Sequence, residues 1–112
     1  MKEQFAASML RVHLGEDDRW RGKPLYEAIV EKCRELGIAG VTVYRGIEGF
    51  GASTRIRHKS HWIFSKDAPI QLSVIDTDEQ IGRLIPHLDG MVDEGLIAIS
   101  HVEAIRYSRD KA

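Results

Sequence analysis

The chain has 112 residues, a length that fits one domain, and its 43% apolar and 29% charged residues predict a folded globular protein rather than a disordered one. The 16 basic and 17 acidic residues leave a net charge of -1, which gives no overall attraction to nucleic acid or to a membrane surface. The single cysteine, Cys33, excludes an internal disulfide and fits a reducing, cytoplasmic setting. No apolar stretch is long enough for a signal peptide or a membrane span.

The N-terminal part of the chain predicts a strand over residues 5–14, after a polar start at residues 1–4 that we expect to be frayed. Within the strand, apolar residues alternate with a second, mixed set. The mixed set consists of Met9, Arg11 and His13. One face of this strand is therefore expected to join the core.

A helix is predicted to begin at Pro24, whose fixed φ suits the first helical position, and to stop at Gly37. Cys33 falls on its apolar face and is expected to be a small core residue. A second strand over residues 41–47 follows.

The C-terminal half predicts a strand over residues 69–76, a second helix and a last strand over residues 96–107. Thr77 with Gln80 three residues later is the capping-box pattern of a helix start. Pro86 lies inside this helix and should kink it. The apolar alternation of the last strand slips near His101, which predicts a bulge there.

This order, β-α-β-β-α-β, indicates an α+β fold of the ferredoxin-like type, with two helices on one face of a four-stranded antiparallel sheet. The other sheet face must be solvated or packed on another subunit. Its predicted residues are mixed: Met9, Ile75 and Ala98 near Arg11, Ser73 and Ser100. We favour burial in an oligomer.

Residues 40–59 lead from the second strand through three glycines into a basic segment, and they hold the candidate ligand-binding residues. These are Arg45, Gly46, Gly49, Gly51, Arg55 and Arg57. The glycines do not form the GxGxxG pattern, and no helix follows that could hold a phosphate, so they are either strand-end hinges or points of close approach to a ligand. The arginines either bind an anionic group or lie on a solvated hairpin tip.

An acidic run, Glu16, Asp17 and Asp18, follows the first strand and is a weak candidate for a divalent metal. The alternative is that Asp17 or Asp18 pairs with Arg19, Arg21 or Lys23. The histidines show no tight metal spacing, and the sequence identifies no nucleophile–base pair, so we do not expect an enzyme.

The segments GEDDRWRGKPLYEAIVEKCRELGIAGVTVYRGIEGFGAS and PIQLSVIDTDEQIGRLIPHLDGMVDEGLI resemble domain-of-unknown-function family 190, a branch of the PII-like (nitrogen-regulatory-protein-like) superfamily. The resemblance covers residues 10–107. It implies a homotrimer with the sheets turned inward and a mobile loop, the T-loop of PII proteins, over about residues 49–67. PII proteins bind adenine nucleotides between subunits, and their T-loops dock on membrane transporters, channels or enzymes.

One segment departs from the PII pattern. PII proteins carry a glycine- and lysine-rich phosphate loop between the second helix and the last strand, whereas here residues 93–95 are Asp-Glu-Gly. Two carboxylates would repel a triphosphate, so a bound anion would depend on Arg45, Arg55 and Arg57.

Two functions follow for a single domain of residues 1–112 with a core over 9–107. The first is a trimeric, cytoplasmic regulator that senses a small anionic ligand, with an adenine nucleotide as one candidate. The alternative is a divalent-metal module that uses the acidic run and binds no nucleotide. Neither involves nucleic acid or a membrane-embedded chain.

Overall fold

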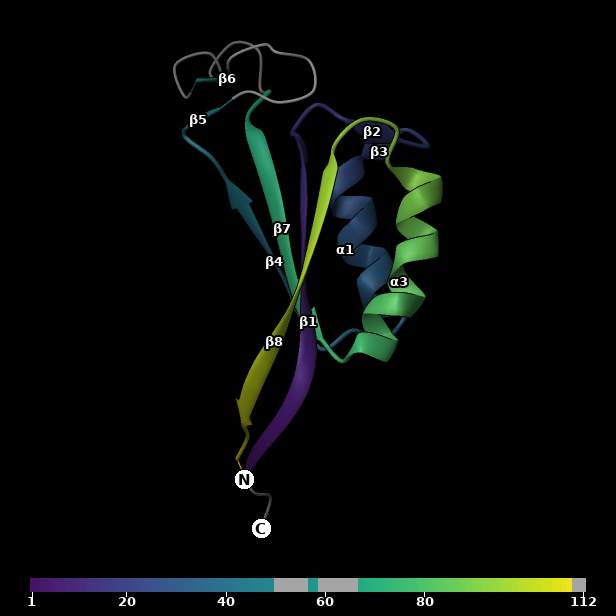
Figure 1. Ribbon diagram of the computed structural model, residues 1–112. Helices are drawn as coiled ribbons and strands as arrows, with labels where there is room; N and C mark the ends of the chain where they lie inside the picture. The colour runs from purple at the N-terminus through teal and green to yellow at the C-terminus, as the bar shows by residue number, and fades with distance from the viewer. Residues whose placement is uncertain (50–56, 59–66, 110–112) are drawn as a thin grey trace.

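A computed structural model describes residues 1–49, 57–58 and 67–109 and contains a four-stranded sheet in the order β4-β7-β1-β8 (Figure 1). Its strands are β1 (Lys2–Gly15), β4 (Val41–Arg45), β7 (Pro69–Asp76) and β8 (Leu96–Tyr107). Every adjacent pair in this sheet is antiparallel. Helix α1 (Leu25–Glu35) connects β1 to β4, and α3 (Asp78–Met91) connects β7 to β8. The predicted ferredoxin-like fold is confirmed.

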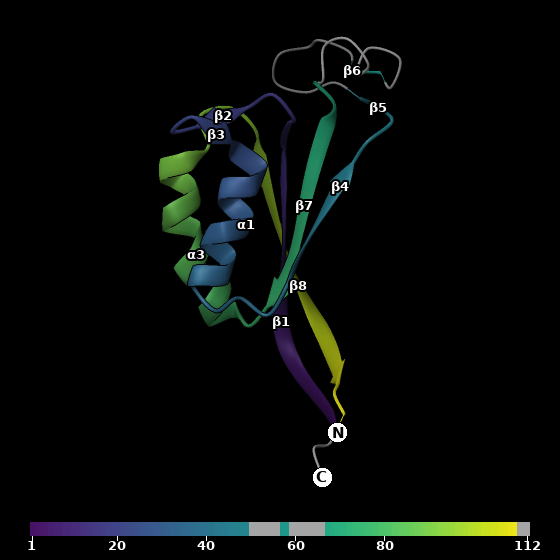
Figure 2. The same cartoon turned by 180° about the vertical axis from the view of Figure 1, so that it is seen from behind.

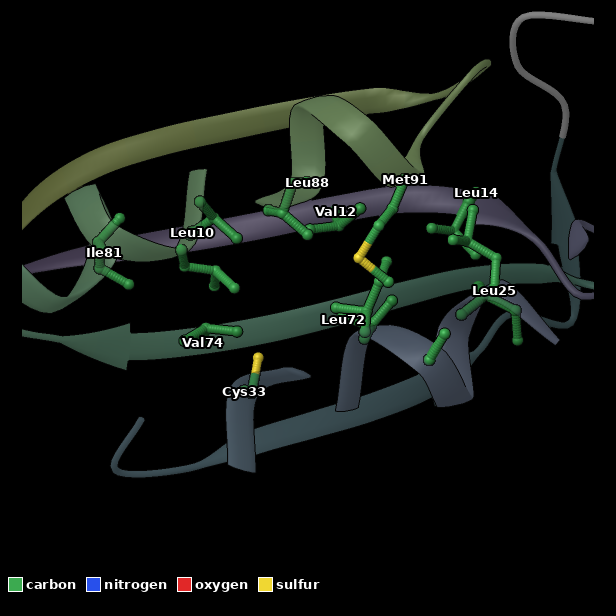
Figure 3. Close-up of a cluster of buried hydrophobic side chains, with 14 residues drawn as sticks. Leu10, Val12, Leu14, Leu25, Cys33, Leu72, Val74, Ile81, Leu88 and Met91 are labelled. Carbon is green, nitrogen blue, oxygen red and sulfur yellow. The ribbon is translucent and has the colours of Figure 1, made fainter. Parts of the chain in front are cut away.

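Both helices cover the same face of the sheet, as Figures 1 and 2 show from opposite sides. The core lies between the helices and the sheet, and it is built from alternate strand residues and one stripe of each helix (Figure 3). Leu10, Val12, Leu72 and Val74 supply the central strand side chains. Cys33 is only 1% exposed, and burial raises the pKa of its thiol to about 11. The cysteine is a core residue, as predicted.

The second helix begins as the sequence predicts, with a modified capping arrangement. The Thr77 hydroxyl accepts the Gln80 N–H at 3.2 Å. The Gln80 side chain does not close the box. It donates instead to the Leu36 and Gly37 carbonyls at the end of α1, at 3.4 and 3.1 Å. The Asp76 carboxylate accepts the Thr77 N–H at 2.7 Å. α3 therefore caps α1 while Asp76 and Thr77 cap α3.

Two details of the helices differ from or extend the prediction. Pro24 is the N-cap of α1 rather than its first helical residue, and Gly37 follows the helix with a φ of 76°, the left-handed conformation that favours glycine. α3 continues through Pro86, and the predicted kink there stays a prediction. Within the described part of the chain, no helix is long and apolar enough to cross a membrane.

β1 and β8 extend past the helical layer as a two-stranded arm that ends near both termini (Figure 1). Their register is unbroken from Lys2 opposite Tyr107 to His13 opposite Leu96. The expected fraying of residues 1–4 and the expected bulge near His101 are therefore wrong. His101 lies 3.7 Å from Asp78, the first residue of α3, so β8 passes the end of this helix there, and beyond it burial no longer selects apolar residues on one face.

Two short hairpins were not predicted. β2 (Arg19–Trp20) pairs with β3 (Lys23–Pro24) across a two-residue turn in which Arg21 and Gly22 have φ values of 50° and 82°. Positive φ at both positions is the type I′ geometry that matches strand twist. β5 (Glu48–Gly49) pairs with β6 (Arg57–His58) beyond the end of β4, which stops at Arg45 rather than at residue 47.

The sheet face that the helices leave uncovered, called here the open face, has the composition expected from the sequence. Met9 lies opposite Ile75 on β7 and Ser100 on β8. Arg11 lies opposite Ser73 and Ala98. All six predicted residues thus share this face, and its burial in an oligomer stays a prediction.

Candidate ligand site at the base of the loop

The candidate site lies where β1, β4 and β7 reach the same end of the sheet. Two backbone hydrogen bonds join the three segments: the Glu16 N–H donates to the Ala68 carbonyl, and the Gly46 N–H donates to the Pro69 carbonyl, both at 2.8 Å. Gly46 precedes the predicted loop and Pro69 follows it. These bonds hold together the two ends of the loop, called here the loop base.

Arg45, the last residue of β4, forms an ion pair with Glu16. The arginine side chain is 50% exposed and the glutamate side chain is 18% exposed. The guanidinium therefore faces solvent at the loop base and is tethered by a carboxylate from β1's end. An anionic ligand would compete with Glu16 for Arg45.

Gly46 and Gly49 both pack against the ring of Pro69. A Cβ placed on Gly46 would lie 2.8 Å from the Pro69 Cγ, closer than real contacts allow, and one on Gly49 would lie at 3.6 Å. The absence of a side chain at Gly46 is thus required by a neighbour within the chain. This favours the strand-end interpretation of Gly46 over close approach to a ligand from that side.

The acidic run divides into residues with different partners. The Asp18 carboxylate accepts the Gly15 N–H at 2.9 Å, and the Asp18 carbonyl accepts the Leu25 N–H at 2.8 Å. Glu16 turns to Arg45 instead. Within residues 1–49, 57–58 and 67–109, no three His, Cys, Asp or Glu residues come together as a metal site.

The basic residues near the acidic run have other partners than those predicted. Lys23 pairs with Glu31 of α1 at 2.9 Å, and the Arg19 guanidinium donates to the Gly22 carbonyl at 2.9 Å. Arg21 stacks over the Trp20 ring at 4.4 Å. These cations thus bind within the β2–β3 hairpin or to α1, whereas the Asp18 carboxylate accepts a hydrogen bond in the turn after β1.

Asp67 is a residue of the loop base that sequence reasoning missed. It is 4% exposed, and its Oδ1 accepts the Asp17 N–H at 3.4 Å. A carboxylate is rarely so buried, because desolvation is costly unless partners compensate. In the sequence Asp67 stands in a turn-like segment before Pro69, where an aspartate is ordinary, so no pattern distinguishes it.

The remaining candidates lie partly beyond the described residues. Gly51 and Arg55 fall outside them, as does the aromatic segment 61–64. Arg57 is placed by its backbone only, opposite Gly49 in the β5–β6 pair. The structure thus brings Arg45, Gly46 and Gly49 together at the loop base, with Glu16 as a partner.

The connection between α3 and β8 is short and acidic. Asp93 and Glu94 are exposed between the end of α3 and the start of β8. A Cβ on Gly95 would meet the His13 carbonyl oxygen at 2.7 Å, so the connection passes directly over the backbone of β1. It offers no basic side chain to a phosphate.

One Ser, His and Asp cluster occurs away from the loop base. The Ser8 hydroxyl donates to Asp78 Oδ1 at 2.5 Å, and His101 Nδ1 lies 3.4 Å from Ser8 Oγ and 3.7 Å from Asp78 Oδ1. In a catalytic triad the histidine separates serine from aspartate and takes the serine proton. Here the buried Ser8 hydroxyl donates its hydrogen bond to the Asp78 carboxylate directly, so the order of the three groups is not that of a triad and the cluster joins β1, α3 and β8.

Comparison with known proteins agrees with this architecture. CPII, a nitrogen regulatory PII-like protein from Thiomonas intermedia K12 solved with ADP, AMP and bicarbonate bound, superposes with a TM-score of 0.66 and 15% identity over 91% of each chain. The divalent ion tolerance protein CutA1 from Ehrlichia chaffeensis superposes with a TM-score of 0.55 and 11% identity, over 93% of this chain and 85% of that one. The fold is that of PII-like proteins.

The sequence comparisons define the family. The family DUF190, described as "Uncharacterized ACR", matches residues 7–104. The UPF0166 protein of Aquifex aeolicus (strain VF5) is 34% identical over 97 residues, which cover 87% of this chain and 91% of that protein. The chain belongs to the DUF190 family, as its GEDD, KPLYEAIVE and RGIEGFG segments predict.

Proposed function

We propose that this protein is a PII-like regulator that binds a small anionic ligand at the loop base and acts on a partner through the loop of residues 49–67. An adenine nucleotide is the first candidate, because CPII has been solved with ADP and AMP. The observation that carries the proposal is the solvent-facing guanidinium of Arg45 at the point where the loop begins.

Arg45 is placed so that ligand binding can reach the loop. A phosphate or carboxylate group that takes the guanidinium from Glu16 removes a link between the ends of β1 and β4. The next residue, Gly46, holds the other end of the loop through the Pro69 carbonyl. Ligand binding would therefore change the contacts at the point where the loop begins, and rearrangement of such a segment is a known mode of switching.

The proposal includes a homotrimer, in which subunits meet through the open face and the ligand lies in the clefts between them. The part of that face toward the arm supports this, because Ile75 is 40% exposed beside Met9, and Val102 and Ala104 continue the apolar surface. The protein is then a single cytoplasmic domain without catalytic activity. Its partner is a transporter, a channel or an enzyme.

Isothermal titration calorimetry of the full chain against ATP, ADP, AMP and cyclic nucleotides tests the ligand. We expect at least one to bind below millimolar concentration and to lose affinity in an Arg45→Ala variant. Glu31→Gln is the matched control, because Glu31 belongs to α1 and its exposed ion pair with Lys23 is not part of the loop base. If no nucleotide binds below millimolar concentration, the proposal fails in this form.

The alternative, a divalent-metal module, takes its support from the likeness of the fold to CutA1. The contacts of the acidic run support the alternative less, because the Glu16 carboxylate pairs with Arg45 and the Asp18 carboxylate accepts the Gly15 N–H. Elemental analysis of the purified protein and of a Glu16→Ala/Asp17→Ala variant discriminates. Stoichiometric metal that disappears in the variant would establish the alternative.

A further inference from the structure

The open face is divided into an apolar part toward the arm and a polar part toward the loop base. Two consecutive cross-strand rows make up the polar part on β4, β7 and β1. The first runs from Thr42 through Ser73 to Arg11, and the second runs from Tyr44 through Gln71 to His13. Successive rows lie about 7 Å apart, the distance between alternate residues of a strand. Arg11 thus has the Ser73 hydroxyl opposite it on β7 and amide and imidazole groups in the next row, while Ala98 lies opposite it on β8.

The charge of Arg11 is not balanced on this face. Of the described residues that share the face, Glu3 is the one carboxylate, and it pairs with Arg106 at 3.5 Å. Arg11 lies eight positions after Glu3 in β1, which is about 27 Å at the rise of an antiparallel strand. The Arg11 side chain is exposed and makes no hydrogen bond or ion pair within the described chain.

Arg11 is also separate from the loop base. Residues that follow each other in a strand point to opposite faces, and Tyr44 shares the row of Gln71 on the open face. Its neighbour Arg45 therefore lies on the other side of the sheet, with Glu16. A ligand on Arg45 cannot neutralise Arg11.

Assembly through the open face creates a specific difficulty, and this step rests on the proposed trimer. Each subunit would bring one Arg11 into the interface without a carboxylate within its reach on the same face, because Glu3 is distant and pairs with Arg106. A guanidinium does not lose its proton in a protein, and burying an unpaired charge is strongly unfavourable. A neutral interface therefore needs an anion from solution.

We propose that the open face forms an oxyanion site in the assembled protein, with the Arg11 residues of adjoining subunits as its charged ligands. The occupant carries a phosphate or a carboxylate group, because a guanidinium presents paired N–H donors to either. The hydroxyl group of Ser73, opposite Arg11, adds a neutral donor, and Thr42 on the next strand adds a second one to the same row. Subunit association is then coupled to anion binding.

Sedimentation velocity of the full chain tests this in sodium chloride, sodium phosphate and sodium acetate at equal ionic strength and pH. We expect the protein concentration at half-assembly to fall at least tenfold in an oxyanion buffer relative to chloride. An effect of both buffers assigns a general oxyanion site, whereas an effect of phosphate alone assigns a phosphate site.

The Arg11→Met variant should assemble equally in all three buffers, because it carries no charge that needs an anion. Arg11→Lys should keep a weaker dependence, and Arg34→Met, an exposed change on α1, should keep the full one. Circular dichroism checks that each variant is folded.

Three results overturn the inference. Equal assembly of the wild-type protein in chloride and in oxyanion buffers shows that no anion is required. Loss of assembly in Arg11→Met in every buffer shows that Arg11 pairs with a carboxylate of another subunit. A wild-type protein that stays monomeric in every buffer refutes the trimer itself, and with it that part of the proposed function.

Discussion

Replacing Glu16 by glutamine should strengthen the binding of an anionic ligand at Arg45. The ion pair between them is half exposed on the arginine side, and such pairs contribute about 0.2–1 kcal/mol. A ligand that displaces Glu16 must overcome this interaction, so its removal should increase affinity by up to about fivefold, using 1.4 kcal/mol per factor of ten. The glutamine side chain keeps the shape of glutamate and removes only its charge.

Calorimetric titration with ADP, at low and at physiological salt, measures this effect. The gain should shrink at the higher salt, because screening weakens exposed ion pairs. Glu31→Gln, which removes a carboxylate of the same kind far from the loop base, should leave the affinity unchanged. Weaker binding in Glu16→Gln would refute the reasoning, and it is the result expected if Glu16 bound a metal that held the nucleotide.

Three further predictions concern residues that stabilise the loop base and the fold that positions it. Gly46→Ala should destabilise the protein and weaken ADP binding, because the Cβ of the alanine would lie 2.8 Å from the Pro69 Cγ. The control Gly90→Ala, in an open position of α3, should instead stabilise the protein by up to about 1 kcal/mol in urea unfolding. Asp76→Ala should lower the unfolding free energy by about 2–5 kcal/mol, because two backbone N–H groups lose a charged acceptor. Cys33 should resist alkylation in the native state at pH 8, because its thiol is buried. Its contribution to the free energy of unfolding should be lost as the pH rises from about 9 to about 11, because the pKa of the folded thiol is raised and the unfolded thiol ionises first. Rapid alkylation without unfolding, or stability that rises over this pH range, would contradict the burial argument.

The elements of the fold could be predicted where local signals and burial agree. β7 has the bounds that its alternation and flanking residues indicate, Pro69–Asp76, and Thr77 caps α3 as its spacing predicts. The prediction was wrong for the arm, where Lys2 and its neighbours pair with β8. Pairing there depends on a strand about 100 residues away, and the helices no longer impose an apolar face.

The candidate site was less predictable because its contacts join distant segments. Arg45 was identified as a candidate, but its partner Glu16 lies 29 positions earlier and was assigned to a separate metal hypothesis. Pro69 begins a strand, as the sequence predicts, but nothing in its neighbours indicates that its ring fills the space beside Gly46. Asp67 stands in a turn-like segment of the sequence, and its contact with the Asp17 N–H comes from a segment 50 positions earlier.

Hydrogen exchange of the full chain with and without saturating ADP tests the central claim most directly. The account predicts slower exchange of the amides at the loop base, in peptides covering residues 44–49 and 67–70, and no change in the arm at residues 2–7. Protection confined to other parts of the chain, or unchanged exchange of the loop base at a concentration where ADP is bound, would contradict it.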